Sequence, residues 1–136
     1  MPPIRNRQVI LADRAPRAIG PYSPGIRSGD LLFTAGQVGL DYRTGQLVES
    51  GIEAQTRQAL ENLKAILEAG GSSLQDVVKT TVFMANLGDF DKMNAVYAEF
   101  FPHDPPARST VQVAALPRSA LVEIECVAMP GGGTGD

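Results

Sequence analysis

Residues 50–71, SGIEAQTRQALENLKAILEAGG, are the stretch of this sequence that most strongly decides the fold. Ser50 and Glu53 have the spacing of a capping box, in which each side chain satisfies a free backbone N–H near the start of a helix. Gly70-Gly71 follows as a pair of residues that tolerate left-handed backbone and end helices. The apolar residues between them recur at helical spacing and form one stripe: Ile52, Ala59, Leu60, Leu63, Ile66 and Leu67. The stretch therefore predicts a helix over residues 51–69 that buries one face.

The segments around this helix have the patterns of strands and of one further helix. Residues 77–84, VVKTTVFM, are rich in β-branched side chains and too short for an isolated helix, which predicts a central strand. Asp89 is expected to cap a second helix that runs to about Phe101 and ends at Pro102. Its inward-facing residues are predicted to be Phe90, Met93, Val96, Tyr97 and Phe100.

Four more strands are expected, over residues 8–11, 31–35, 109–114 and 121–128, and residues 31–35 are expected to be buried. In the last of these, Val122, Ile124, Cys126 and Ala128 alternate with Glu123, Glu125 and Val127. This order of elements predicts an α+β domain whose helices cover one face of a sheet. The other, partly apolar face needs cover, which suggests an oligomer.

Length and charge narrow the class of protein. The 136 residues fit a single domain over 1–136, with flexible ends at 1–6 and 130–136. Twelve Lys and Arg against fifteen Asp and Glu give a net charge of −3, which makes nucleic acid a poor candidate partner. No apolar stretch approaches the roughly 20 residues of a membrane span. No apolar segment of signal-peptide length follows the basic N-terminus, so a cytoplasmic location is expected.

The scarcity of Cys and His limits the kinds of disulfide, metal and catalytic sites that the chain can form. The chain has one Cys (Cys126) and one His (His103), so an intramolecular disulfide is excluded and a zinc site of Cys and His ligands is disfavoured. Cys126 alternates with strand positions that face the core and is expected to be a buried thiol rather than a nucleophile. Arg, Glu, Tyr, Thr or backbone groups would have to carry any catalysis.

Arg108 and Glu123 are the first candidates. Arg108 lies between Pro105-Pro106-Ala107 and a strand, so the prolines would stiffen the approach of a guanidinium suited to bidentate carboxylate binding. The alternative is a solvated or ion-paired arginine at a strand entry. Glu123 and Glu125 project from one strand face, where they suit acid–base work if a pKa is raised, or else form an ordinary solvated face.

Glycine-rich turns offer a second kind of candidate. Gly36, Gly39 and the turn Gly20-Pro21-Tyr22 would expose backbone N–H and C=O groups to a small ligand, and Tyr22 would wall a pocket. These glycines match neither the dinucleotide-binding nor the P-loop pattern, so no phosphate site is indicated.

Taken together, six segments in order over about residues 8–129 resemble the Rid (YjgF-type) family of reactive-intermediate deaminases. They are AIGPYS (18–23), FTAGQV (33–38), VKTTVF (78–83), NAVY (94–97), PARSTV (106–111) and VEIE (122–125). The resemblance implies a chorismate-mutase-like α+β fold with a mixed sheet and two helices on one face. It also implies a homotrimer in which three sheets form a central barrel that covers the bare face, with ligand sites between subunits.

The activity that the resemblance implies is hydrolysis of 2-imino acids and their enamine tautomers, such as 2-aminoacrylate, to 2-oxo acids and ammonia. Pyridoxal-phosphate enzymes release these intermediates, and the deaminase itself needs no cofactor and no metal. Arg108 matches the family arginine that holds the substrate carboxylate, and Glu123 matches the glutamate that positions or activates water. Tyr22, Gly36, Asn94 and Thr110 match or fall at positions that line the substrate site.

Two residues depart from the common family pattern. Ala35 stands where many members have Ser, and Thr110 stands where many have Cys. Imine hydrolysis needs an anchored carboxylate, a water and proton transfer, so neither change forbids it, although both bear on substrate preference and rate. Endoribonuclease activity with inhibition of translation, and a non-catalytic small-molecule-binding or chaperone-like role, are the alternative functions.

Overall fold

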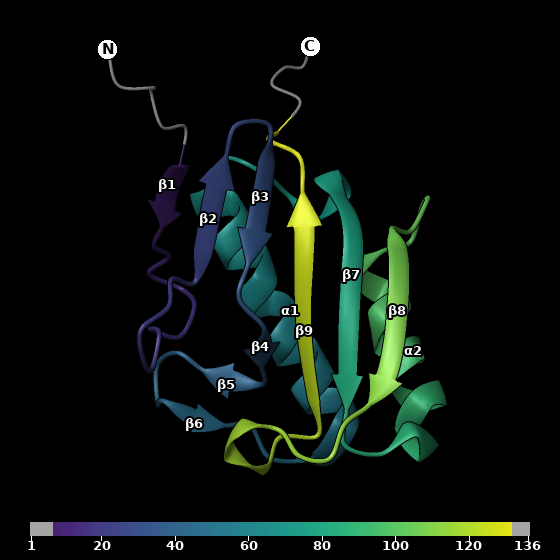
Figure 1. The fold of residues 1–136 in the computed structure, drawn as a ribbon. Coiled ribbons are helices and arrows are strands. Elements are labelled where there is room, and N and C mark those ends of the chain that lie inside the picture. The colour runs from purple at the N-terminus through teal and green to yellow at the C-terminus, as the bar shows by residue number, and fades with distance from the viewer. Residues whose placement is uncertain (1–6, 132–136) are drawn as a thin grey trace, which may run out of the picture.

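The computed structural model describes residues 7–131, which form one mixed sheet backed by helices (Figure 1). The main sheet has the order β1-β2-β3-β9-β7-β8, and β4 continues the β3 side against β9. Its strands are β1 (Arg7–Ile10), β2 (Gly25–Ser28), β3 (Leu31–Thr34), β4 (Gln37–Val38), β7 (Val77–Met84), β8 (Ala107–Gln112) and β9 (Val122–Ala128). The pair β7–β8 is parallel and the others are antiparallel. Two short strands, β5 (Leu40–Asp41) and β6 (Gln46–Leu47), pair separately.

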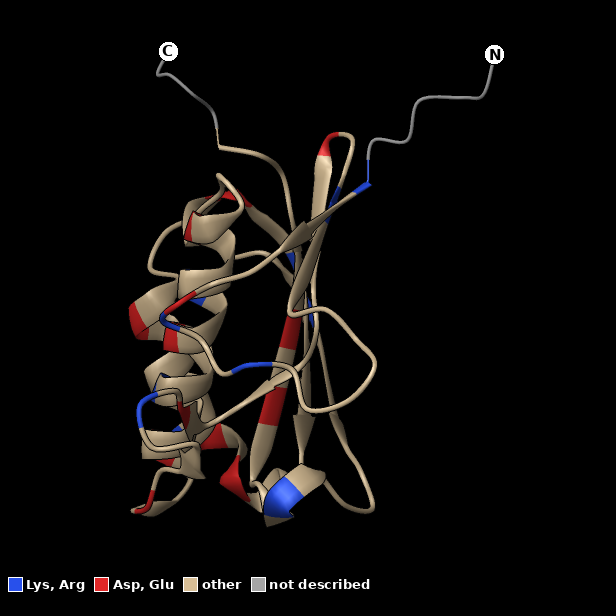
Figure 2. Ribbon diagram, turned by 90° about the vertical axis from the view of Figure 1, so that its left-hand side faces the viewer, with Lys and Arg blue, Asp and Glu red and all other residues tan. Residues whose placement is uncertain are grey.

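Two α-helices, α1 (Gly51–Ala69) and α2 (Phe90–Phe100), lie on the same side of the sheet. Figure 2 shows this arrangement edge-on, with the helices in one layer and the strands in the other. Short 3-10 turns, η1 (Leu74–Asp76), η2 (Leu87–Asp89) and η3 (Pro117–Ser119), precede β7, α2 and β9. The expectation of an α+β fold with a mixed sheet and two helices on one face is therefore confirmed.

The bounds predicted for α1 are confirmed, but the predicted capping box is wrong. Ser50 and Gly51 both have left-handed backbone, with φ of 82° and 87°, and the Ser50 side chain makes no capping hydrogen bond. The chain enters the helix through a turn that does not aim the hydroxyl at the free N–H groups. At the other end Gly71 has φ of 80°, and the N–H groups of Gly71 and Ser72 donate to the carbonyls of Glu68 and Leu67. This is a Schellman motif, as the glycine pair predicted.

The helix α2 begins differently from the prediction. Asp89 stands at the N-cap position with φ of −90° and ψ of 9°, and its side chain makes no capping bond. The cap lies earlier: Asn86 Oδ1 accepts a hydrogen bond of 2.8 Å from the Gly88 N–H at the start of η2. Asp89 is the last residue of that turn, so its backbone is already close to helical.

Of the five α2 residues predicted to face inward, the buried ones are Met93, Val96 and Tyr97. Phe100 is partly buried against the core, whereas Phe90 is 36% exposed, which corrects the prediction for that residue.

Alternation in β9 divides the sheet into two faces. Val122, Ile124, Cys126 and Ala128 are buried under the helices, as predicted, and the residues between them are half-buried on the open face. The strand β3 was expected to be buried, but Leu32 is its one buried residue. Leu31 and Phe33 are 38% and 42% exposed because they point to the open face.

The helix α1 holds the segment that leads into the candidate site. The buried side chain of Asn62 donates hydrogen bonds to the carbonyls of Val38 (3.2 Å) and Leu40 (2.9 Å). Gly39 packs so tightly that a Cβ there would lie 2.8 Å from Gln55 Cα. The short strand β4 is therefore fixed both by β9 and by the helix beneath it.

A single domain over residues 1–136 stays a prediction. The predicted flexible ends lie outside the described residues, apart from 130 and 131, and there the Gly131 N–H donates to the Gly71 carbonyl at 2.6 Å.

Candidate active site

A bulge between β3 and β4 shapes one side of the site. Phe33 pairs with Val127 and Gln37 pairs with Ile124, so three residues on one strand (34–36) face two on β9 (125–126). The extra residue interrupts the ladder, and the Thr34 hydroxyl fills the gap by accepting a 3.0 Å hydrogen bond from the Cys126 N–H. The bulge brings the backbone of residues 35 and 36 beside Glu123.

Gly36 and Glu123 are in intimate contact. A Cβ on Gly36 would overlap Oε2 of Glu123 and would lie 2.7 Å from its Cδ. A residue with a side chain could occupy this position only if the carboxylate moved away. The sequence motif that contains Gly36 therefore has a physical reason: the bare backbone makes room for the Glu123 carboxylate.

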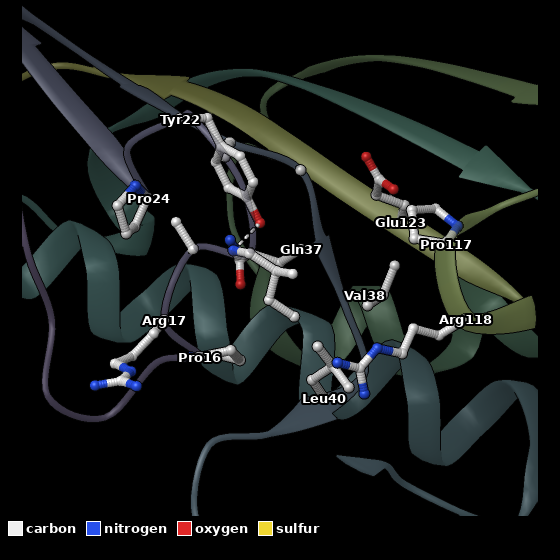
Figure 3. Close-up of a pocket in the computed structure, with 14 residues that line it drawn as sticks. Pro16, Arg17, Tyr22, Pro24, Gln37, Val38, Leu40, Pro117, Arg118 and Glu123 are labelled. Carbon is white, nitrogen blue, oxygen red and sulfur yellow. Dashed lines mark hydrogen bonds between the residues drawn. The ribbon is translucent and has the colours of Figure 1, made fainter. Parts of the chain in front are cut away.

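Gly36 and Glu123 line a pocket of about 450 Å³ on the open face (Figure 3). Tyr22 forms another part of the lining, and its hydroxyl is fixed by a 3.1 Å hydrogen bond from the Ile19 N–H. Ala35 also lines this pocket, so one of the two departures from the common family pattern lies at the candidate site. Three of the residues expected at the site, Tyr22, Gly36 and Glu123, therefore meet.

Sequence reasoning missed several pocket residues, among them Arg17, Gln37 and Arg118. Figure 3 shows Arg17 on the far side of the pocket from Glu123, whereas Arg118 lies below Glu123 on the same side, with its guanidinium beside Leu40. Arg118 is held there by a 2.9 Å hydrogen bond from its Nη1 to the Gly45 carbonyl, and its own φ is 61°. The one indication of Arg118 in the sequence was the turn Leu116-Pro117-Arg118-Ser119 before β9. The residue types in this turn do not predict the left-handed backbone that the structure has at Arg118.

The environment of Glu123 favours its protonated form. Burial raises the pKa of the Glu123 carboxyl above its usual value, and the nearby negative charge of Glu125 raises it further. A half-buried carboxyl with a raised pKa beside a pocket is suited to passing a proton to and from a bound water.

The second group of predicted site residues lies at the edge strand β8 and on α2. The Arg108 guanidinium carbon lies 4.7 Å from the centre of the Tyr97 ring and 5.5 Å from that of Phe90. Thr110 is two residues along β8 and faces the same side. Asn94 stands between Phe90 and Tyr97 on that face of α2, and its buried Oδ1 has no hydrogen-bond partner among residues 7–131.

Strand register separates the two groups within one chain. Arg108 is opposite Thr80 on β7, and the Thr80 side chain bonds to Tyr97 on α2, so both point to the helix side. Glu123 is opposite Phe83, three residues further along β7, and alternates with residues that are buried under the helices. The structure thus brings Tyr22, Gly36 and Glu123 together, and separately groups Arg108, Asn94 and Thr110, on opposite faces of the sheet.

Cys126 belongs to neither group. It is buried, and burial raises the pKa of its thiol to about 12. A thiol that stays protonated and enclosed in the core is no nucleophile, in agreement with the sequence-based interpretation.

The family model described as Endoribonuclease L-PSP, the Rid (YjgF) family, matches residues 12–130. The chain belongs to this family. A RutC family protein of Pyrococcus horikoshii is 52% identical over 90% of this chain and 97% of its own length. The mouse 2-iminobutanoate/2-iminopropanoate deaminase is 47% identical over 92% of this chain and 93% of its own.

Solved Rid structures share the fold. Escherichia coli TdcF, crystallised with bound serine, superposes with a TM-score of 0.86 at 43% identity, covering 91% of this chain and 99% of the other. Within residues 7–131 of the present chain, neither helix has the length and apolar character that crossing a membrane would require.

Proposed function

We propose that this Rid protein is a cytoplasmic 2-iminobutanoate/2-iminopropanoate deaminase, which hydrolyses the imines and enamines released by pyridoxal-phosphate enzymes. The observation that carries the proposal is the half-buried Glu123 carboxyl, packed against bare Gly36 at a pocket and with a raised pKa. The similarity to proteins named as deaminases with this specificity supports the same reaction.

Arg108 supplies the second requirement, a site for the substrate carboxylate. Among the described residues Arg108 forms no salt bridge, and its guanidinium rests on aromatic rings instead. No carboxylate in the described part of the chain neutralises its charge, which is therefore available for an anion that a guanidinium binds bidentately.

The positions of Arg108 and Glu123 on opposite faces of the sheet favour an assembly of several copies of the chain. Arg108 and Glu123 cannot meet within one chain, so a site that uses both takes them from different copies. A homotrimer with its sheets around a central barrel would meet this need and would also cover the open face. That face carries exposed apolar residues on the three strands β1, β3 and β8: Val9, Leu31, Phe33 and Val111.

In this proposal the reaction uses one water molecule, and Glu123 relays the protons. Arg108 of one copy binds the carboxylate of the protonated imine and leaves the C=N carbon beside the Glu123 of another copy. Glu123 accepts a proton from the attacking water, a C–O bond forms, and the carboxyl then gives that proton to the nitrogen. As the C–N bond breaks, the hydroxyl gives its proton to the Glu123 carboxylate, which passes it to the released ammonia, so the products are a 2-oxo acid and ammonium.

Ala35 and Thr110 would affect the rate and the substrate preference, but neither would carry out a step of the reaction. Ala35 leaves that part of the pocket lining without a hydroxyl, so water there must be held by Glu123 and by backbone groups. Thr110 presents a hydroxyl near Arg108, where it can hydrogen-bond to a bound carboxylate but cannot act as a thiolate.

The test generates 2-iminobutanoate in situ and traps the remaining imine with semicarbazide. The wild-type protein should lower the trapped imine, and Arg108→Ala should reduce kcat/KM by at least about a hundredfold, since a charged hydrogen-bonded pair is lost. Equal rates for the two proteins would contradict the proposal.

Endoribonuclease activity is the second candidate, because the description of the matching family model names it. The net charge of −3 disfavours it. Degradation of single-stranded RNA by the purified wild type, lost in Glu123→Gln, would favour this function over imine hydrolysis.

A further inference from the structure

The guanidinium of Arg108 is held by aromatic rings, both from α2. Its carbon lies 4.7 Å from the Tyr97 ring centre and 5.5 Å from the Phe90 ring centre. Both distances are within the range in which a ring face attracts a cation. Phe90 begins α2 and Tyr97 follows two turns later, so the rings form a platform on one side of the helix.

The Tyr97 ring is itself fixed. Its hydroxyl lies 2.7 Å from Thr80 Oγ1 in a buried hydrogen bond, and its ring packs against that of Phe101 at 4.7 Å between centroids. Thr80 is also the residue opposite Arg108 in the β7–β8 ladder. Thr80 therefore pairs with the strand position of Arg108 and also hydrogen-bonds to Tyr97, whose ring lies beneath the Arg108 guanidinium.

The platform holds the cation without neutralising it. Burial raises the pKa of the Tyr97 phenol, an effect that the bond to Thr80 and the charge of Arg108 oppose but do not reverse. The phenol therefore stays uncharged at neutral pH. A carboxylate in this place would hold the guanidinium equally well, but it would compete with a substrate carboxylate for the same N–H groups.

We propose that Phe90 and Tyr97 are positioning residues for the imino-acid carboxylate site. They hold the Arg108 guanidinium in a fixed place before substrate arrives, and Thr80 holds Tyr97. The inference rests on the proposed function, in which Arg108 binds the carboxylate. Without the rings, a long arginine side chain must be ordered on each binding event, and that cost weakens the affinity.

Phe90→Leu and Tyr97→Leu, measured in the semicarbazide assay, test this directly. Phe90 is 36% exposed, so its variant removes a ring without opening the core. Both substitutions should raise KM for 2-iminobutanoate roughly two- to thirtyfold and leave kcat within about twofold, because binding is weakened equally before and in the transition state. Kd for the product 2-oxobutanoate should rise by the same factor. Tyr97→Phe keeps the ring but loses the hydrogen bond to Thr80, so it should raise KM less than Tyr97→Leu does.

Tyr42→Leu is the matched control. Tyr42 is 40% exposed and also lies under an arginine, with the Arg43 guanidinium carbon 5.6 Å from its ring centre, but it is not part of either group of site residues. Its loss should leave KM and kcat unchanged.

The side-chain Nε–H resonance of Arg108, assigned by its absence in Arg108→Ala, gives a readout independent of turnover. It should be shifted by the ring currents in the wild type and should move toward the position of a free arginine in both leucine variants. If the resonance moves but KM and Kd do not, or if it does not move at all, the inference fails and the deaminase proposal stands. If the wild type neither binds 2-oxobutanoate nor hydrolyses the imine, both fall.

Discussion

Gly36 and Gly39 are separated by two residues, yet replacing each with alanine should have a different effect. The change at Gly36 should lower activity, and the change at Gly39 should lower stability. A Cβ at Gly36 would meet the end of the Glu123 side chain, which can swing away. A Cβ at Gly39 would meet backbone atoms of Gln55, at 2.8 Å from Cα and 2.9 Å from the carbonyl oxygen, and these cannot move without shifting α1.

Gly36→Ala should therefore lower imine hydrolysis at least about tenfold with little loss of stability, while Gly39→Ala should cost about 1–3 kcal/mol of unfolding free energy. The first is measured with the semicarbazide assay and the second by urea unfolding. An active and fully stable Gly36→Ala protein would show that the carboxylate position is not required.

Glu123 also makes the stability of the protein depend on pH. Since its pKa is raised in the folded state, the folded protein holds a proton that the unfolded chain has released, in the pH range between about 4.3 and the folded pKa. Stability from this group is present at low pH and is lost as the pH rises through the folded pKa. The residue proposed for proton transfer is thus a stability cost at neutral pH.

Glu123→Gln should remove this dependence. The Tm of the variant relative to wild type should be higher at pH 7 than at pH 4, by up to a few degrees, because the group is only half-buried. Glu68→Gln on the exposed side of α1 is the control and should show a smaller change. A Tm difference that shrinks from pH 4 to pH 7 would mean that the carboxyl is not destabilised in its charged form.

At the scale of elements, the bulge between β3 and β4 is the feature that makes the pocket. It depends on one side chain, because the Thr34 hydroxyl accepts the Cys126 N–H that the ladder leaves without a backbone partner. The hydroxyl also lies 3.8 Å from the Cys126 sulfur.

Thr34→Val should cost about 1–2 kcal/mol of unfolding free energy, as the Cys126 N–H loses its acceptor. It should also lower activity, because the backbone of Gly36 follows the bulge. Thr34→Ser keeps the oxygen and should retain most of both. Urea unfolding of the two variants distinguishes them, and a Thr34→Val protein as stable as the wild type would show that the hydroxyl does not hold the bulge.

Elements whose pattern is local could be predicted from the sequence. The stripe on α1 repeats over five turns and its glycine pair closes a Schellman motif, so its bounds were right. The capping residues were wrong because Ser50 and Asp89 have backbone conformations that no residue pattern reveals. Leu31 and Phe33 looked like core residues because composition does not say which face of a strand another copy would cover.

The candidate site was predictable as a set of residues but not as an arrangement. The family resemblance indicated Arg108 and Glu123 as site residues. Which face of the sheet each side chain lies on depends on the register of β8 and β9 against β7. Shifting either strand by one residue would put the two side chains on the same face. Long-range register of this kind leaves no mark in the sequence near either residue.

For the whole molecule, the sheet has one face under helices and one face with exposed apolar residues, and the two groups of site residues lie on opposite faces. In the proposed deaminase each active site takes Arg108 from one copy of the chain and Glu123 from another. A cyclic trimer provides such contacts, because each of its interfaces joins two different surfaces.

Mixing two inactive proteins tests this most directly. Arg108→Ala and Glu123→Gln are combined in equal amounts, exchanged through partial unfolding and refolding, and assayed for 2-iminobutanoate hydrolysis. Random assembly places an intact Arg108 next to an intact Glu123 at about one site in four, so activity should return to about a quarter of wild type. If the mixture stays as inactive as its two components, the site does not form between copies and the account is wrong.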